Sequence, residues 1–225
     1  MKAPVNPHTG EPLLYGRRSG RPLKGNQQSR LDTGLARWGL EIDAIAEAKS
    51  LGSLFPCATR EHWLEIGFGG GENLAAQVGQ YPDIGHIGVE FFENGVSQAC
   101  KHLLELDQDN VRLVHGDGRL VLDALPAQSL TKVFILHPDP WPKKRHHFRR
   151  IVNFEVLDRL AVLMKPGAEL RLATDHPSYK PWMLQKVLDH PEFEWLATSK
   201  SDWETYPDDW PQTRYAAKAV QEGRP

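Results

Sequence analysis

The chain contains the stretch Leu64-Glu-Ile-Gly-Phe-Gly-Gly-Gly-Glu72, in which an expected strand, residues 62–66, passes into an expected helix, residues 73–80. Glycines at such a turn let the backbone approach a ligand closely. A dinucleotide-binding GxGxxG turn would need Gly or Ala at position 72, and Glu72 is a poor neighbour for a pyrophosphate. The pattern from Glu65 to Gly71 therefore favours a cofactor that lacks phosphates and carries positive charge.

Strands and helices alternate on both sides of this turn. The expected strands are residues 62–66, 86–91, 111–115, 131–137 and 169–174, with two more near 193–198 and 213–219. The expected helices are residues 73–80, 95–106, 147–164 and 181–188, preceded by short helical pieces within 31–55. This alternation predicts an α/β fold with a doubly wound, mostly parallel, seven-stranded Rossmann-like sheet.

Four acidic residues fall at the carboxyl ends of successive expected strands: Glu65, Glu90, Asp117 and Asp139. Ligands of doubly wound sheets bind at this edge. Glu90 has the spacing from the glycines of an acid that accepts hydrogen bonds from two ribose hydroxyls, and Asp117 is placed to receive an adenine amino group. One such acid alone is more commonly a helix cap or turn residue, but four around one glycine turn indicate a binding site.

The composition is that of an ordinary globular protein. At 225 residues the chain is large enough for one α/β domain with appendages. Its two cysteines are far apart, which favours a reducing compartment, and its ten histidines show no metal-binding spacing. No apolar run approaches the roughly 20 residues of a membrane span, and the N-terminus lacks the apolar core of a secretory signal. We therefore expect a cytoplasmic protein with no metal and no membrane partner.

The net charge of −2 conceals two concentrated basic segments. Residues 1–30 hold six Lys or Arg and one acid, and residues 143–150 hold five Lys or Arg and no acid. One such cluster is usually a solvated face, but two on an otherwise acidic body favour a surface that binds nucleic acid. Residues 1–30 lack hydrophobic periodicity, so we expect a flexible basic arm followed by a single domain, residues 31–225.

The second basic segment follows a proline-rich loop, Leu136-His-Pro-Asp-Pro-Trp-Pro-Lys-Lys-Arg145. Each proline restricts its own φ and the residue before it, so Asp139 is expected on a stiff loop at a strand end. A rigid acid beside cations that attract phosphate indicates an enzyme acting on nucleic acid. The candidate RNA-contacting residues are Lys144, Arg145, Arg149 and Arg150 after the loop, and Arg17 and Arg18 in the arm.

The order of these motifs resembles the class I S-adenosylmethionine-dependent methyltransferases, and more finely the bacterial tRNA (guanine-N7)-methyltransferase family. The residues that carry the resemblance are Arg17-Arg-Ser-Gly-Arg-Pro22, Leu64–Gly71, Gly88-Val-Glu90, Gly116-Asp117, Pro138-Asp-Pro-Trp-Pro-Lys143, Arg145-His-His-Phe-Arg-Arg150, Ala173-Thr-Asp-His176 and Thr213-Arg-Tyr215. The match spans nearly the whole chain. It implies S-adenosyl-L-methionine as cofactor and, as the methylated atom, N7 of a guanosine at position 46 in the variable loop of tRNA.

The resemblance also implies roles for individual residues. Glu65, Gly67, Gly69, Glu90, Asp117 and Asp139 would contact the methyl donor, and Lys143, Asp175, Thr213, Arg214, Tyr215 and Ala216 would contact the guanosine. The family usually has Glu where this chain has Ala216. The role of that Glu is therefore missing here or supplied by a neighbour such as Glu204 or Asp209, and a weakened enzyme is left open.

Methylation at N7 needs no general base, because guanine N7 carries a lone pair and no proton. The purine gains positive charge, so fixed carboxylates near the base would stabilise the charge that develops. Asp139 is the catalytic candidate, and Asp175 is a candidate for the same role or for reading the guanine edge. N7 lies in the groove of an RNA helix that is too deep and narrow to read, so the target must lie in a loop or be extruded.

Three other interpretations stay open. A nicotinamide-dependent oxidoreductase would share the fold, although Glu72 and the Pro-Asp-Pro-Trp string argue against it. The Asp-Pro-Trp string also resembles the loop of enzymes that methylate exocyclic amines of RNA. A non-catalytic tRNA-binding subunit with a vestigial methyltransferase fold would explain Ala216. Whether the protein is a monomer or a homodimer is also open.

Overall fold

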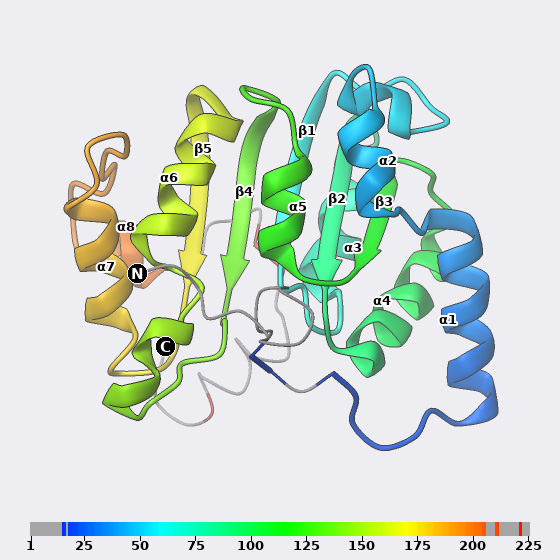
Figure 1. The fold of residues 1–225 in the computed structure, drawn as a ribbon, viewed down its shortest axis with the longest axis horizontal. Helices are drawn as coiled ribbons and strands as arrows, with labels where there is room; N and C mark the ends of the chain where they lie inside the picture. Colours follow the sequence, from blue (N-terminus) through cyan, green and yellow to red (C-terminus); the bar gives the residue numbers. More distant parts are fainter. Residues whose placement is uncertain (1–14, 17, 206–209, 212–220, 222–225) are drawn as a thin grey trace, which may run out of the picture.

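The computed structural model describes residues 15–16, 18–205, 210–211 and 221. In this part of the chain a five-stranded parallel sheet forms the centre, with strand order β3-β2-β1-β4-β5 (Figure 1). The strands are β1 Glu61–Ile66, β2 Ile84–Glu90, β3 Val111–His115, β4 Leu130–Leu136 and β5 Met164–Ala173. The strand order reverses at β1, so the sheet is doubly wound and the predicted fold class is confirmed.

Helices cover both faces of the sheet. They are α1 Gly25–Trp38, α2 Ile42–Glu47, α3 Glu72–Gln80, α4 Glu93–Leu106, α5 Gly118–Ala124, α6 Phe154–Leu163, α7 Lys180–Leu188 and α8 Ser201–Glu204, with 3-10 helices η1 Leu51–Leu54 and η2 Lys144–Arg149. Figure 1 shows α5 and α6 in front of the sheet and α3 and α4 behind it, while α1 lies against α4 beyond β3. None of the helices in the described ranges has both the length and the apolar character to cross a membrane.

The central strands are buried on both faces because helices lie on both sides. Residues 133–136 of β4 are all buried, and each large apolar side chain among them contributes roughly 1.5–3 kcal/mol of burial free energy. In β1, Leu64 lies opposite both Ile87 of β2 and Val133 of β4. Since all five strands run in the same direction, their carboxyl ends meet at one edge of the sheet.

The helix expected over residues 147–164 is shorter in the structure. Residues 144–149 form η2, and α6 begins only at Phe154. Asn153 separates the two, because its backbone is extended (φ −145°, ψ 169°) and its Oδ1 accepts a hydrogen bond from Val156 N at 3.0 Å. An Asn in this position is a typical N-cap, which the continuous apolar spacing of the segment concealed.

Other element boundaries also differ from expectation. Residues 193–198 form no strand: Phe193 packs against the core, but Leu196 is 76% exposed, and the segment pairs with no described strand. Residues 213–219 lie outside the described residues, so the described sheet has five strands rather than seven. Helix α1 begins at Gly25, inside the segment expected to form the arm. Helix α5 had not been expected and starts directly after Asp117.

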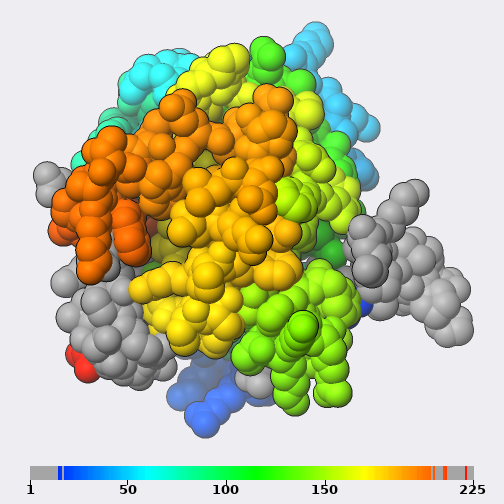
Figure 2. Space-filling view, turned by 90° about the vertical axis from the view of Figure 1, so that its left-hand side faces the viewer, coloured from blue at the N-terminus to red at the C-terminus, as the bar shows by residue number. Residues whose placement is uncertain are grey.

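The β5 side of the molecule is covered by α7 and the segment that follows it. Figure 2 shows these residues (orange) at the surface of this side, with the η2 segment (bright green) below them. In Figure 1, η2 lies at the end of the molecule toward which the strand arrows point. The basic segment is therefore exposed next to the carboxyl ends of the strands.

The turn after β1 depends on its glycines. Gly67 and Gly71 have φ values of 73° and 77°, a left-handed conformation that costs other L-residues about 1–2 kcal/mol. At Gly71 an added Cβ would also lie 2.4 Å from the Cβ of Ala99 on α4, whereas at Gly67 it would meet nothing within 4 Å. Gly71 therefore permits the close packing of α3 against α4 as well as the turn.

We expect Gly71→Ala to destabilise the protein by about 2–5 kcal/mol, through backbone strain and overpacking together. Gly67→Ala adds the same methyl group at a similar φ without the clash, so its cost should be the backbone strain alone, about 1–2 kcal/mol. Urea unfolding of both variants measures the difference. Equal losses would show that Ala99 and α4 shift aside at little cost.

Candidate active site

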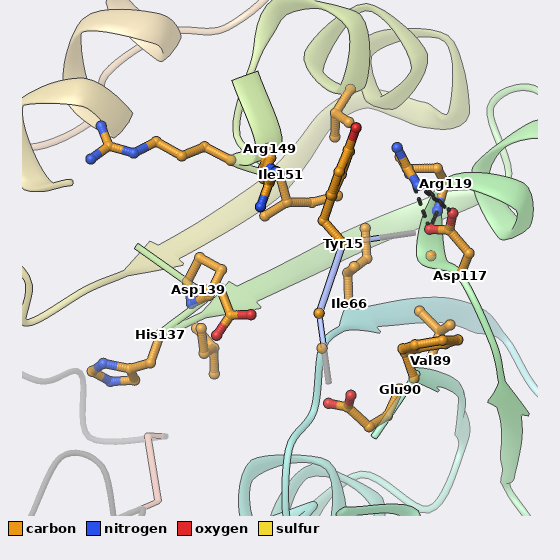
Figure 3. Close-up of a pocket in the computed structure, with 18 of the residues that line it drawn as sticks. Tyr15, Ile66, Val89, Glu90, Asp117, Arg119, His137, Asp139, Arg149 and Ile151 are labelled. Carbon is orange, nitrogen blue, oxygen red and sulfur yellow. Dashed lines mark hydrogen bonds and ion pairs between the residues drawn. The ribbon is translucent and has the colours of Figure 1, made fainter. Parts of the chain in front are cut away.

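A cavity of about 1040 Å³ opens at the edge of the sheet where the strands end. Its walls come from the loops after β1, β2, β3 and β4, from η2 and the first turn of α6, and from Trp182 and Lys186 of α7. Tyr15 of the N-terminal segment also lines it (Figure 3). Segments far apart in the sequence thus meet at one site, as in other doubly wound sheets.

Glu65 at the end of β1 is the most deeply buried of the four predicted acids. The residue is 3% exposed, and its Oε2 accepts a hydrogen bond from Asn73 Nδ2 at 2.9 Å. Burial, with Glu72 and Glu90 close by, raises the pKa of Glu65 to about 8 against the opposing effect of the Asn73 bond. The carboxyl group therefore carries a proton at neutral pH, and a nearby cation would favour its release.

Glu90 at the end of β2 holds the glycine turn and also faces the cavity. Its Oε2 accepts a hydrogen bond from Gly69 N at 2.8 Å, and its Oε1 accepts one from Phe92 N at 2.8 Å. A carboxylate has about four acceptor positions, so these backbone bonds leave room for a ligand. Burial raises the pKa of Glu90. The side chain is fixed in place, and its contact with ribose hydroxyls stays a prediction.

Asp117, after β3, caps helix α5 and pairs with Arg119 of that helix. Its Oδ1 accepts a hydrogen bond from Arg119 N at 3.0 Å, and its Oδ2 lies 2.8 Å from Arg119 Nη2 in an ion pair drawn with dashed lines in Figure 3. The helix-cap interpretation, the commoner one for a single acid, therefore applies to Asp117. The predicted contact with an adenine amino group would have to share this carboxylate with Arg119.

The proline-rich loop after β4 has a strained backbone on both sides of Asp139. His137 and Trp141 have φ values of 49° and 41°, in the left-handed region that favours glycine. Such residues cost of order 1–3 kcal/mol each and cluster at functional sites. His137 also precedes Pro138, and a proline normally restricts the residue before it to extended backbone. The loop therefore keeps one shape at the expense of local strain.

Asp139 presents its carboxylate to the cavity. Figure 3 shows Asp139 and Glu90 pointing into the same space from the ends of β4 and β2. The Asp139 side chain is exposed to the open cavity, yet the surrounding protein removes enough water to raise its pKa. Two fixed carboxylates that face one cavity attract a cation.

Asp175, after β5, lies beside this loop. Its Oδ1 is 3.8 Å from His137 Nδ1, and burial lowers the pKa of His137. Asp175 is therefore at the same edge of the sheet as Asp139, as expected, but it is not among the described residues that line the cavity. Its contact with guanosine stays a prediction.

The basic residues after the loop divide into an exposed and an enclosed group. Lys143, Lys144 and Arg145 are exposed and form a positive surface beside the acidic cavity. Arg150, which we had assigned to RNA contact, does not belong to this surface. It is 1% exposed, and its guanidinium donates hydrogen bonds to Pro140 and Ser178 instead. The structure corrects that assignment, because a buried guanidinium cannot reach phosphate in this conformation.

Arg149 lies at the rim of the cavity among three aromatic rings. Its Cζ is 4.3 Å from the ring centre of Tyr15, 4.9 Å from that of Trp141 and 5.5 Å from that of Phe148. Cation–π contacts of this kind are worth about 0.5–2 kcal/mol each. They hold Arg149 in place next to the Asp139 loop.

Tyr15 is a cavity residue that the sequence did not reveal. Figure 3 shows its ring between the Asp139 side and the Asp117 side of the cavity. The chain that leads to it is anchored on α4, because Asn94 Oδ1 accepts a hydrogen bond from Gly20 N at 2.7 Å and Asn94 Nδ2 donates one to Arg21 O at 2.9 Å. A single aromatic residue without periodic neighbours carries no signal of such a position.

The structure leaves several predicted residues undescribed. Arg17, Thr213, Arg214, Tyr215 and Ala216 lie outside the described residues, whereas Arg18 is described and exposed. Within the described ranges, no group of three or more His, Cys, Asp and Glu side chains is arranged to hold a metal ion.

The arrangement suits two ligands of opposite charge. The acidic cavity suits a small molecule with a positive centre, and the exposed cations beside it suit a polyanion. Asp139 lies between the two, on a loop whose backbone is rigid. A group transferred from the small molecule to the polyanion would pass near this carboxylate.

Known proteins match this chain over most of its length. A family model described as a putative methyltransferase matches residues 59–225. The tRNA (guanine-N(7)-)-methyltransferase of Rhodospirillum rubrum is 45% identical over 96% of this chain and 86% of its own. That of Azorhizobium caulinodans is 46% identical over 94% of this chain and 90% of its own.

Solved structures of methyltransferases are also similar. The precorrin-6y C5,15-methyltransferase of Geobacter metallireducens has a TM-score of 0.48 and 16% identity, over 77% of this chain and 76% of that one. The identities near 45% over almost the full length of both chains are decisive. This protein belongs to the family of tRNA (guanine-N7)-methyltransferases.

Proposed function

We propose that this protein transfers a methyl group from S-adenosyl-L-methionine to N7 of a guanosine in tRNA. The observation that carries the proposal is the acidic cavity with Asp139 at its mouth, next to the exposed cations Lys143, Lys144 and Arg145. Relatives that bear this activity in their names are similar over nearly the whole chain. The methylated position would be 46 in the variable loop. The protein would work in the cytoplasm without a metal, as a monomer or homodimer.

The cavity fits the proposed cofactor. A sulfonium cation suits the neighbourhood of Glu65, because burial raises the pKa of this carboxyl group to about 8 and a positive charge nearby would favour its ionised form. Glu90 would hold the ribose, Gly67 and Gly69 would let the backbone approach, and Asp117 would contribute at the adenine end. When bound, S-adenosyl-L-methionine supplies an activated methyl group.

The chain's own residues would act on charge and position. Asp139 would stabilise the positive charge that arrives on the purine, from a loop that strain and prolines keep rigid. Lys143, Asp175 and residues 213–216 would hold the guanosine, and Lys144, Arg145 and Arg149 would hold the RNA backbone, with Arg18 and Arg17 in support. No residue is asked to remove a proton, because N7 has none.

The direct test is product analysis. Purified protein, S-adenosyl-L-methionine and tRNA lacking the modification should yield N7-methylguanosine, detected by mass spectrometry and by cleavage with borohydride and aniline. A methyl group on an exocyclic amine would support the amine methyltransferase interpretation. Tight tRNA binding without any methylation would support the non-catalytic one.

Cofactor affinity should depend on the protonation of Glu65. Its raised pKa of about 8 means that the group is mostly protonated below pH 8, and a bound cation favours its ionised form. Cofactor binding should therefore release a proton, and affinity should rise by up to about tenfold per pH unit between pH 6 and 8, then level off. Titration calorimetry in buffers of different ionisation enthalpy measures both effects.

The Glu65→Gln variant is the control, since it keeps the shape of the side chain and removes its titration. Its affinity should lose the rise that Glu65 causes and keep only the pH dependence of the cofactor amine and of the other cavity carboxyl groups, Glu90 and Asp139. If wild type and variant share one pH profile, Glu65 does not ionise on binding.

Asp139→Asn should lower the single-turnover methylation rate by about 10²–10³-fold, while the affinity for either substrate changes less than about threefold. The substitution keeps shape and an acceptor oxygen but removes the charge. Burial raises the pKa of Asp139, so the wild-type rate should be level at neutral and alkaline pH and should fall as pH drops through this raised pKa. The rate of the variant should not show this fall at low pH. A wild-type rate for Asp139→Asn would leave it only a loop-shaping role.

The double variant Lys144→Ala, Arg145→Ala should weaken tRNA binding without changing cofactor affinity. Each lost phosphate contact should reduce the slope of log affinity against log salt by roughly 0.7–0.9. The control is Lys49→Ala, Lys165→Ala, which removes the same charge from exposed positions between α2 and η1 and at the start of β5, and should leave the slope unchanged. Equal effects of the two pairs in filter binding would show that net charge alone matters.

A further inference from the structure

Arg150 is a buried cation at the cavity to which the proposed function gives no role. It is 1% exposed, and its three hydrogen bonds go to neutral acceptors: Nε donates to Pro140 O at 2.8 Å, Nη1 to Ser178 O at 3.2 Å and Nη2 to Ser178 Oγ at 2.9 Å. Its Cζ also lies 4.8 Å from the ring centre of Tyr179 and 5.0 Å from that of Trp182. A buried charge is costly to desolvate, and apolar residues often replace one without loss of stability. Its presence here therefore needs an explanation beyond stability.

The acceptors of this guanidinium lie on the two loops that carry the predicted carboxylates. Pro140 directly follows Asp139 in the loop after β4, and Ser178 lies in the loop after β5 that also carries Asp175. Ser178 Oγ is also 3.1 Å from Nδ1 of His176, the neighbour of Asp175. One planar group thus connects both loops, and the two bonds to Ser178 fix the orientation of the guanidinium plane.

The two aromatic rings that pack against the guanidinium are themselves fixed by hydrogen bonds. Tyr179 Oη accepts a hydrogen bond from Val152 N at 3.2 Å, and Trp182 Nε1 donates one to Val152 O at 2.7 Å. Asn153 Nδ2 donates to Arg150 O at 2.8 Å. The two rings that pack against the guanidinium are therefore tied to the chain segment that follows Arg150, so the connection between the loops has little freedom to move.

We propose that Arg150 is a positioning residue that fixes the Asp139 and Asp175 carboxylates relative to each other for the methyl transfer to guanosine. The inference rests on the proposed function for its kinetic consequence. Its action is geometric, because its guanidinium bonds to the backbone oxygens of Pro140 and Ser178 and to the Ser178 hydroxyl. A displacement of about 1 Å at a reacting centre can cost on the order of 10²-fold in rate.

The alternative is that Arg150 only stabilises the fold. Asn110 is a suitable control, because it is also a buried polar residue that donates three hydrogen bonds. Asn110 is 2% exposed, and its Nδ2 donates to Val78 O at 3.3 Å, Tyr81 O at 3.1 Å and Ile84 O at 3.0 Å. It therefore ties α3, the turn after it and the start of β2 together, as Arg150 ties two loops, but it precedes β3, at the edge of the sheet opposite the cavity.

The experiment compares Arg150→Lys with Asn110→Ala in the full-length protein. A lysine keeps the charge but cannot reach three acceptors in one plane. We expect Arg150→Lys to lower the single-turnover rate at saturating substrates by about 10–100-fold, with cofactor affinity and the salt slope of tRNA binding within about twofold of wild type. Asn110→Ala should lower the melting temperature while its rate stays within about threefold. A rate loss in Arg150→Lys no larger than in Asn110→Ala would overturn the proposal, and a changed salt slope would return Arg150 to phosphate contact.

A double-mutant cycle tests whether the effect passes through Asp139. In an Asp139→Asn background, Arg150→Lys should cost less than about threefold in rate, because the carboxylate that it positions has lost its charge. Rate effects that simply multiply would contradict the proposal.

Hydrogen exchange gives a readout that does not need activity. In Arg150→Lys the backbone N–H groups of His137, Asp139 and Trp141 and those of Asp175, His176 and Ser178 should exchange faster together, whereas in Asn110→Ala they should not. Unchanged exchange in both loops would overturn the proposal that Arg150 connects them. Absence of tRNA methylation by the wild type would overturn the proposed function instead, and hydrogen exchange would still test the connection between the loops.

Discussion

Parallel pairing of all five described strands is the constraint on which the site depends. It brings the carboxyl end of every strand to one edge, where all four predicted acids line the cavity and three of them have local partners. Asn73 bonds to Glu65, backbone N–H groups bond to Glu90, and Arg119 pairs with Asp117. Like charges in a partly desolvated space raise carboxyl pKa values. The cavity is therefore arranged to bind a cation. This property follows from the common direction of the strands, which gathers the acids at one edge.

The second determinant is the separation of charge across the mouth of the cavity. Acids line the interior, and exposed cations of η2 stand outside it, so two ligands of opposite charge can bind side by side without competing. Arg149 lies between these zones, enclosed by Tyr15, Trp141 and Phe148. Aromatic rings hold Arg149 at the rim, where its charge adds to the positive potential.

Rigidity at Asp139 comes from contacts made over long sequence distances. Three prolines limit the loop, but they do not explain the left-handed backbone of His137 and Trp141. That conformation persists because the surrounding structure holds it. His137 N donates a hydrogen bond to Ala173 O at 2.8 Å, and Arg150 binds the carbonyl of Pro140 from the opposite side. Local strain is thus balanced by bonds to β5 and to the loop after it.

Local patterns in the sequence determined the glycine turn after β1, the alternation of elements and the acids at strand ends, because each depends on residues only a few positions apart. The same patterns missed the cap at Asn153, since its own apolar neighbours masked it. Tertiary structure alone decided the burial of Arg150 and the place of Tyr15 in the cavity. Ser178, which binds Arg150, is separated from it by 28 residues, and the ring of Tyr15 meets Arg149 only after the chain has folded. Sequence specifies the charge of an arginine, but whether that charge faces phosphate or a carbonyl depends on which distant segment packs beside it.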